Sequence, residues 1–252
     1  MKKIILPLVG LWSILSLFFL ISTLPLFAQD RPQGLDNRGP LTKITFIHHK
    51  KGHTKPNQPG KPTKPPAEST CYGFLARGAK WKTAEDYVIN PDNSDGLSSF
   101  FIVNSLAAGV GQWETYGGNI FGAGSTNYSA AYGQYDYQNS VQFGRYPDPN
   151  VIAVTSVWGY FSGPLQTREL VEWDMLFNDA SLWDWGEAIA DPTLMDLQNI
   201  ATHELGHSAG MDDLYETTCQ AETMYGYSTE GETSKRDLAP GDKTGIQKLY
   251  QP

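Results

Sequence analysis

Two histidines and a glutamate lie close together late in the chain, in the order His203-Glu204-Leu205-Gly206-His207. Side chains four residues apart on a helix share one face, so both imidazoles can reach the same metal ion. The glutamate between them is placed to take a proton from a water molecule at that metal. This spacing is typical of zinc hydrolases.

The residues that follow strengthen this interpretation. Gly210 lies three positions after His207, where the helix must end and the chain must turn, and glycine adopts left-handed dihedral angles without strain. Asp213 lies three positions further on, and its carboxylate would complete a site of two imidazoles and one carboxylate, with a fourth position open for water. The neighbouring Asp212 is the main competitor.

The hydrophobic pattern predicts the elements that must position this motif. Residues 81–90 predict a strand, and apolar residues at three- and four-residue steps over 100–113 predict a helix. Residues 117–150 are rich in Gly, Tyr, Asn, Ser and Gln and predict short strands and long loops. Residues 151–160 and 169–178 are rich in Val, Ile, Phe, Trp and Leu and predict two neighbouring strands.

Two further helices are expected in the last quarter of the chain. An Asp-Pro dipeptide, which suits a helix cap and first turn, predicts a helix over 191–210 that carries the two histidines. A last helix is expected to begin near Asp242 and to bury Ile246 and Leu249.

Composition divides the chain into three parts. Residues 1–28 have a basic start and an apolar run over 4–27, which predicts a secretory signal peptide or an N-terminal anchor in the cell membrane. Residues 29–70 hold seven prolines and predict a disordered linker or short pro-segment. Residues 71–252 predict one folded domain, and either form of the first segment places that domain outside the cytoplasm.

Charge separates the last two parts. Residues 30–70 contain eight Lys or Arg against three Asp or Glu, whereas residues 71–252 contain nine against twenty-four. Such an asymmetry is typical of a solvated tail beside a folded domain. The acidic domain argues against a nucleic-acid partner. The tail histidines His48, His49 and His53 are expected to be solvated, with metal binding as the alternative.

The zinc motif with Gly210 and Asp213, followed by Met224-Tyr225, resembles the matrixin branch of the metzincin metallopeptidases, as found in secreted prokaryotic members. Matching stretches span nearly all of residues 71–252, and they lie within 80–90, 172–178, 223–227 and 241–250.

The resemblance implies an α+β, zincin-like fold: a mixed twisted sheet, an active-site helix, a further packing helix and a C-terminal helix. It implies a methionine-containing turn, Met224 and Tyr225, beneath the metal, and a main pocket lined by residues 225–238. The implied activity is that of a monomeric zinc endopeptidase acting on extracellular proteins, with zinc on His203, His207 and Asp213 and Glu204 as general base. An extended substrate is expected to pair with an exposed edge strand near 154–160.

The chain also departs from that family. Animal matrixins have a third histidine where this chain has Asp213, and residues 71–252 have no further histidines for a second, structural zinc site. Calcium is a second candidate cofactor, because carboxylates offer the oxygen ligands it prefers, but the pattern selects no loop. The carboxylates considered are Asp136, Asp148, Asp174 and Asp179.

Cys71 and Cys219 are the only cysteines. An even number in an exported chain favours one disulfide. The alternative is a cysteine switch, in which the Cys71 thiolate blocks zinc in a latent precursor, but the Pro-Arg-Cys-Gly surroundings of matrixin pro-segments are absent.

Three other interpretations compete with the peptidase. In the first, the third zinc ligand is a glutamate further along the chain, such as Glu230 or Glu232, as in other zinc hydrolases. A surface-tethered zincin-fold protein would bind without turnover, although such proteins usually lose the glutamate that this chain keeps at position 204. In the third, the basic residues 30–70 are the functional part: they bind an acidic cell surface, and the domain is only attached to them.

Overall fold

The computed structural model describes residues 37–52, 71–180 and 182–251. The predicted signal or anchor over 1–28 therefore lies outside the described residues, as do 29–36 and 53–70 of the predicted linker. Among the residues that are described, no helix is both long enough and apolar enough to cross a membrane.

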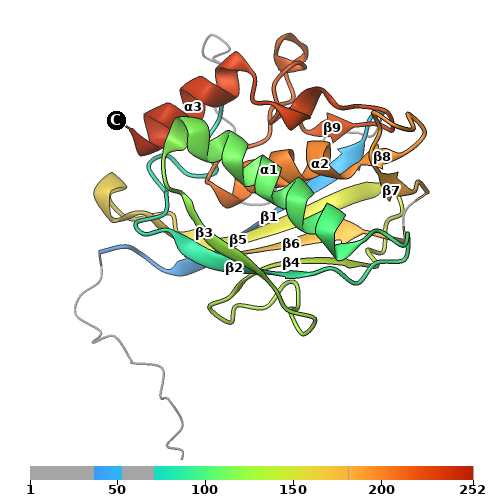
Figure 1. The fold of residues 1–252 in the computed structure, drawn as a ribbon. Coiled ribbons are helices and arrows are strands. Elements are labelled where there is room, and N and C mark those ends of the chain that lie inside the picture. The colour runs from blue at the N-terminus through green and yellow to red at the C-terminus, as the bar shows by residue number, and fades with distance from the viewer. Residues whose placement is uncertain (1–36, 53–70, 181, 252) are drawn as a thin grey trace, which may run out of the picture. The chain divides into compact units, whose positions relative to one another are not determined.

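A seven-stranded mixed sheet forms the body of the domain, in the order β3-β2-β4-β6-β5-β1-β9 (Figure 1). Its strands are β1 (Leu41–Lys50), β2 (Glu85–Asn90), β3 (Phe121–Thr126), β4 (Asn139–Gly144), β5 (Val151–Tyr160), β6 (Glu169–Asn178) and β9 (Tyr227–Ser228). A separate two-stranded ribbon joins β7 (Trp185–Gly186) and β8 (Met195–Asp196).

Three α-helices complete the domain, and they are α1 (Ser99–Gly117), α2 (Leu197–Ser208) and α3 (Pro240–Tyr250). Helices α1 and α2 contact the sheet. Helix α2 lies between the sheet and α1, and α3 packs on α1 (Figure 1). The predicted α+β architecture, with a site helix, a further packing helix and a C-terminal helix, is confirmed.

Several predicted elements appear with small shifts in their bounds. β5 and β6 match the two predicted strands and pair antiparallel. Helix α1 begins after Ser98, whose side chain accepts a hydrogen bond from Phe101 N, and it continues to Gly117. The predicted strand over 81–90 begins only at Glu85, because Trp81 turns inward and donates its indole N–H to Ser208 O over 2.8 Å.

The predicted start of the site helix at 191 is wrong. Asp191 accepts hydrogen bonds from Thr193 in a turn, and α2 begins after Asp196, which caps it by accepting from Asn199 N at 2.9 Å. The Asp196 carboxylate also accepts from Ala188 N and Arg236. Tertiary partners therefore select the second aspartate as the cap.

The prediction of a disordered linker is wrong for residues 41–50. These residues form β1, which pairs with β5 over nine positions and with β9 over two. Alternation along the strand turns Phe46 and His48 inward, where both are buried. Consequently β5 is an interior strand, and the expectation of an exposed edge near 154–160 is wrong for this state of the chain.

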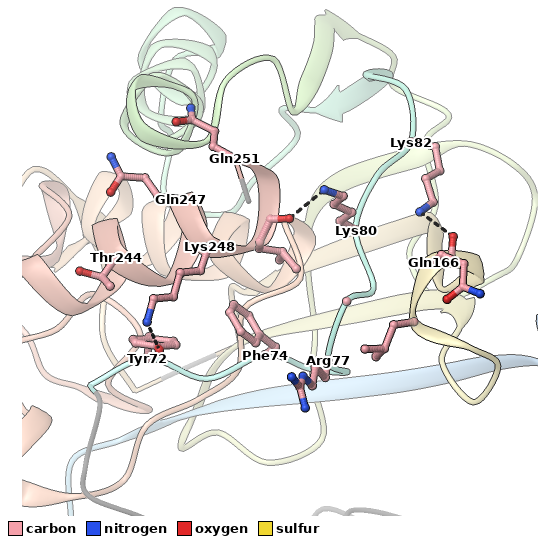
Figure 2. A pocket seen from close by; sticks show the side chains of 13 residues that line it. Tyr72, Phe74, Arg77, Lys80, Lys82, Gln166, Thr244, Gln247, Lys248 and Gln251 are labelled. Atoms are coloured by element: carbon pink, nitrogen blue, oxygen red, sulfur yellow. Dashed lines mark hydrogen bonds between the residues drawn. The ribbon is translucent and has the colours of Figure 1, made fainter.

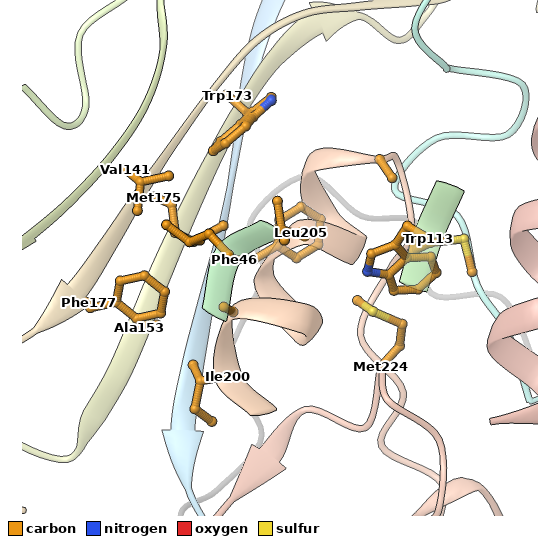
Figure 3. Close-up of a cluster of buried hydrophobic side chains, with 14 of the residues drawn as sticks. Phe46, Trp113, Val141, Ala153, Trp173, Met175, Phe177, Ile200, Leu205 and Met224 are labelled. Atoms are coloured by element: carbon orange, nitrogen blue, oxygen red, sulfur yellow. The ribbon is translucent and has the colours of Figure 1, made fainter. Parts of the chain in front are cut away.

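The hydrophobic core lies between the sheet and α2, and it continues between α2 and α1 (Figure 3). Phe46 from β1 and Leu205 from α2 are both buried in it. On the other side of α2, Trp113 donates its indole N–H to Thr202 O over 2.7 Å. The helix that carries the histidines is thus held by packing on both sides.

A disulfide joins Cys71 and Cys219, as predicted, with 5.3 Å between their Cα atoms. It ties the start of the 71–252 segment to the loop before Met224. Because this bond uses both cysteines of the chain, neither is a free thiolate that could block a metal.

Candidate metal centre

Helix α2 carries His203, Glu204 and His207 on buried turns, and all three are at most 1 % exposed. The Nε2 atoms of the two histidines lie 3.2 Å apart. Asp213 Oδ1 lies 3.3 Å from His203 Nε2 and 3.4 Å from His207 Nε2. These three atoms therefore form a nearly equilateral triangle.

This triangle fits a zinc ion. With zinc–ligand bonds of about 2.0–2.1 Å, neighbouring ligands of a tetrahedral site are separated by about 3.3–3.4 Å. Two imidazoles and one carboxylate are also a ligand set that zinc accepts, with a fourth position left over. The structure brings together the three residues that the sequence predicted as ligands.

Backbone carbonyls fix the orientation of both imidazoles. His203 Nδ1 lies 2.7 Å from Thr223 O, and His207 Nδ1 lies 3.2 Å from Met211 O. A carbonyl can only accept, so Nδ1 carries the proton and the lone pair of Nε2 points into the triangle. Burial lowers the pKa of His203 to about 4, which keeps this imidazole in the neutral form that binds metal.

The turn after α2 delivers Asp213 to the site. Gly210 has a φ of +100°, and a Cβ at this position would come within 3.0 Å of Ala79 O. The predicted need for glycine here is therefore confirmed. Tyr215 donates its hydroxyl to Asp213 Oδ2 over 3.0 Å and so orients the carboxylate.

The predicted methionine turn lies directly beneath α2. Met224 is buried, and a Cβ on Gly206 would come within 2.2 Å of Met224 Sδ, so the helix approaches the methionine where it has no side chain. The backbone N–H of Met224 donates to Asp242 Oδ1 over 3.2 Å. Tyr225, which follows, is half-buried and lies beside Tyr227.

Glu204 lies beside the triangle with both carboxylate oxygens in hydrogen-bond contact. Thr155 donates to Oε2 over 2.5 Å, and His48 Nδ1 lies 3.2 Å from Oε1. Burial raises the pKa of Glu204 to about 7. A carboxylate with such a pKa can exchange a proton near neutral pH, which suits a general base.

His48 and Phe46 are residues of this site that the sequence analysis assigned to a solvated tail. His48 is 2 % exposed, and Phe46 stacks on the His207 ring with centroids 3.9 Å apart. A short signal was present in the sequence, since the apolar residues Ile44 and Phe46 alternate with the polar residues Lys43 and Thr45 as in a half-buried strand.

The rival third ligands lie elsewhere. Glu230 pairs with Lys50, and Glu232 lies 3.8 Å from Lys235 Nζ. Among the described residues, two groups of three or more side chains could hold a metal: His203, His207 and Asp213, and His48, His203 and Glu204. Neither group includes Glu230, Glu232 or Asp212.

Calcium is not supported as a cofactor. The two candidate ligand groups within the described segments contain none of the four aspartates considered for it. Two of them instead stabilise local structure, because Asp148 accepts from Asn150 and Asp174 accepts from Gly133 N and Ser140 Oγ.

The unfolding free energy should be larger at pH 5 than at pH 8. Glu172 and Asp174 are buried in β6, and burial raises their pKa values to about 7 and about 6. At these two carboxyl groups the folded chain therefore binds more protons than the unfolded chain between about pH 4 and 7, so their contribution to stability falls as pH rises through this window. Denaturant unfolding of wild type and Glu172→Gln at both pH values checks this.

Glu172→Gln should reduce the difference between the two pH values, while the exposed control Glu216→Gln should leave it unchanged. An equal pH dependence in wild type and Glu172→Gln would contradict the assignment.

A surface pocket lies away from the triangle, between α3 and residues 72–82 (Figure 2). Its rim is basic, with Lys80 donating to Leu249 O and Lys248 to Tyr72 Oη. None of the candidate metal ligands lines it. The pocket is therefore separate from the chemistry described above.

Comparison with known families gives a match to the Matrixin family model over residues 141–251. The match runs from β4 to α3 and includes α2, Asp213 and Met224. It leaves out β1 and α1. No curated protein matches the chain.

Proposed function

Because this chain is a matrixin-like metzincin, a zinc metallopeptidase by family, we propose that it is a zinc-dependent endopeptidase that cleaves proteins outside the cytoplasm. The single observation that best supports this is the triangle of His203 Nε2, His207 Nε2 and Asp213 Oδ1, whose sides of 3.2–3.4 Å suit zinc. Under this proposal, the three side chains hold the ion.

Zinc, when bound, supplies a Lewis acid that acidifies water and polarises the scissile carbonyl. Glu204 takes the proton of the attacking water and returns a proton to the leaving amine nitrogen. Thr155 holds one oxygen of that carboxylate, which fixes its direction. Tyr215 holds the outer oxygen of Asp213 and keeps the inner one toward the two imidazoles.

Under this proposal the substrate is an extended polypeptide. The domain acts as a monomer and does not bind nucleic acid. Once its edge is free, β5 offers backbone groups with which such a peptide can pair. Tyr227 lies in β9, which borders the far side of the position now taken by β1, and the Tyr225 ring contacts the Tyr227 ring. These two aromatic rings favour apolar or aromatic side chains in the main pocket. Residues 1–28 remain the proposed signal or anchor that carries the domain out of the cytoplasm.

Metal analysis and metal removal test this function. Because β1 covers Glu204, we would introduce a recognition sequence for a site-specific protease within residues 53–70. Cutting the chain there allows β1 to be released before the measurement. We expect near one zinc ion per chain, hydrolysis of unfolded casein by the cut chain, loss of hydrolysis with a chelator, and recovery on adding zinc. Absence of zinc, or a zinc-loaded cut chain without hydrolysis, would refute the proposal.

A further inference from the structure

The pocket between α3 and residues 72–82 gathers positive charge on an acidic domain (Figure 2). Residues 71–252 contain nine Lys or Arg against twenty-four Asp or Glu. None of the twenty-four is among the described residues that line the pocket, whereas four of the nine are: Arg77, Lys80, Lys82 and Lys248. The pocket therefore attracts anions, although the domain as a whole repels them.

The chain does not neutralise these four cations. None of them forms an ion pair with another residue of the described segments. The three ammonium groups donate to uncharged oxygens instead: Lys80 to Leu249 O at 2.9 Å, Lys248 to Tyr72 Oη at 2.8 Å and Lys82 to Gln166 O at 3.4 Å. Burial and then the nearby Lys82 ammonium lower the pKa of Lys80, as expected where cations lie together without an anion.

Backbone contacts fix the segment that carries three of these cations. Leu75 N donates to Gly210 O over 3.0 Å, which joins the segment to the turn after α2. Arg168 donates to Arg77 O over 2.8 Å. Gly78 has a φ of +80° and makes the turn beside Arg77, whose side chain is exposed. These contacts preorganise the pocket, so less entropy is lost when a ligand binds.

The rest of the lining suits a polypeptide. The pocket combines apolar or aromatic side chains with three side-chain amides, namely Tyr72, Phe74, Leu165 and Leu249 together with Gln166, Gln247 and Gln251. An amide both donates and accepts, so it matches the N–H and C=O groups of a peptide. The cavity volume of about 940 Å³ lies within the range of ligand sites, about 300–1,000 Å³. Apolar walls between cations fit acidic residues mixed with apolar ones better than they fit a sulfated polysaccharide.

A short backbone connection links the pocket to the candidate metal centre. Phe74, which lines the pocket, forms a β-bridge with Met211. The carbonyl of Met211 is the group that orients the His207 imidazole. An extended polypeptide advances by about 3.3 Å per residue, so one unfolded substrate can contact both places.

We propose that this pocket is an exosite, a second binding site that holds an acidic segment of the polypeptide substrate while another segment is cleaved at the metal centre. This inference rests on the proposed function. Carboxylates of the segment pair with Arg77, Lys82 and Lys248, and its apolar residues contact the walls. Binding there raises the local concentration of the rest of the substrate at the cleft, which lowers KM and leaves kcat unchanged.

Binding of a probe peptide to the intact full-length chain tests the site independently of hydrolysis. The probe is a fluorescent hexapeptide of four glutamates and two leucines, and its control has glutamine in place of each glutamate. Fluorescence anisotropy should give a Kd below about 1 mM for the glutamate peptide and at least about tenfold weaker binding of the glutamine peptide. Added salt should weaken binding of the glutamate peptide.

Two double variants locate the binding. Arg77→Gln with Lys248→Gln should weaken binding of the glutamate peptide about tenfold, because each change removes a cation from the pocket. Arg145→Gln with Lys243→Gln is the matched control, since it also removes one arginine and one lysine of α3, and neither residue lines the pocket. It should bind the peptide like the wild type.

Hydrolysis by the cut chain tests the link to the substrate. The two substrates are unfolded casein and the same casein extended by the glutamate hexapeptide. We expect the extension to lower KM at least about threefold in the wild type and in the control variant, with kcat unchanged. The difference should disappear in the variant with Arg77→Gln and Lys248→Gln.

The outcomes separate the two proposals. No binding of the glutamate peptide, or equal loss in both double variants, would overturn the exosite and leave the peptidase standing. Binding of a sulfated disaccharide in place of the peptide would also overturn it, as would equal KM values for the two caseins. Binding of the peptide by a chain whose cut form hydrolyses neither casein would refute the proposed function.

Discussion

Glu204→Gln is expected to lower casein hydrolysis by the cut chain about 10²–10⁴-fold, while zinc content stays near that of the wild type. The amide cannot accept the proton of the attacking water. Residue 204 is not one of the three ligands of the triangle, so zinc should stay bound to the variant. Steady-state hydrolysis rates and metal analysis of the same preparations measure both quantities.

Glu232→Gln is the matched control, because Glu232 lies in the segment after the methionine turn and belongs to neither candidate ligand group. It should hydrolyse casein at close to the wild-type rate. Substantial hydrolysis by Glu204→Gln would remove this glutamate from the mechanism. Loss of zinc from that variant would instead assign it a role in holding the metal.

Asp213→Ala is expected to weaken zinc binding by about 100-fold or more and to abolish hydrolysis. Removing even a residue that only orients a metal ligand costs about 10–100-fold in affinity. Loss of a ligand should cost more, because it leaves two imidazoles to hold the ion. Competition with a fluorescent zinc chelator measures the affinity.

Two further variants make this result specific. Asp213→His should keep zinc, since an imidazole is a good zinc ligand and animal matrixins have histidine at the corresponding position. Asp212→Asn should bind zinc like the wild type, because Asp212 stands outside both candidate groups. Full zinc affinity in Asp213→Ala would favour a third ligand from the segment after Met224, such as Glu230 or Glu232.

The sequence determined the core of the candidate site because its ligands lie close together along the chain. A helix places residues 203 and 207 on one face, and a glycine stop then returns Asp213 to them within a single turn. Spacing alone fixes such local geometry. The disulfide was also predictable, since two cysteines in a chain that is predicted to be exported have one possible pairing.

Tertiary structure decided the start of α2. The sequence predicted a cap at Asp191, but α2 begins after a second aspartate five residues later, Asp196. Asp196 is the cap because its carboxylate also accepts hydrogen bonds from Ala188 N and from Arg236, which lies forty residues later. Local propensity cannot choose between two caps when a distant residue supplies the difference.

Tertiary structure also decided the place of residues 41–50. Their composition is that of a solvated tail, and one short apolar patch between prolines cannot stabilise a strand by itself. The neighbours β5 and β9 supply the missing hydrogen bonds, and the core around α2 supplies a place for Phe46 and His48. The sequence by itself therefore determined which residues form the candidate metal centre. Only the folded chain shows what covers that centre, because the covering strand depends on partners more than a hundred residues away.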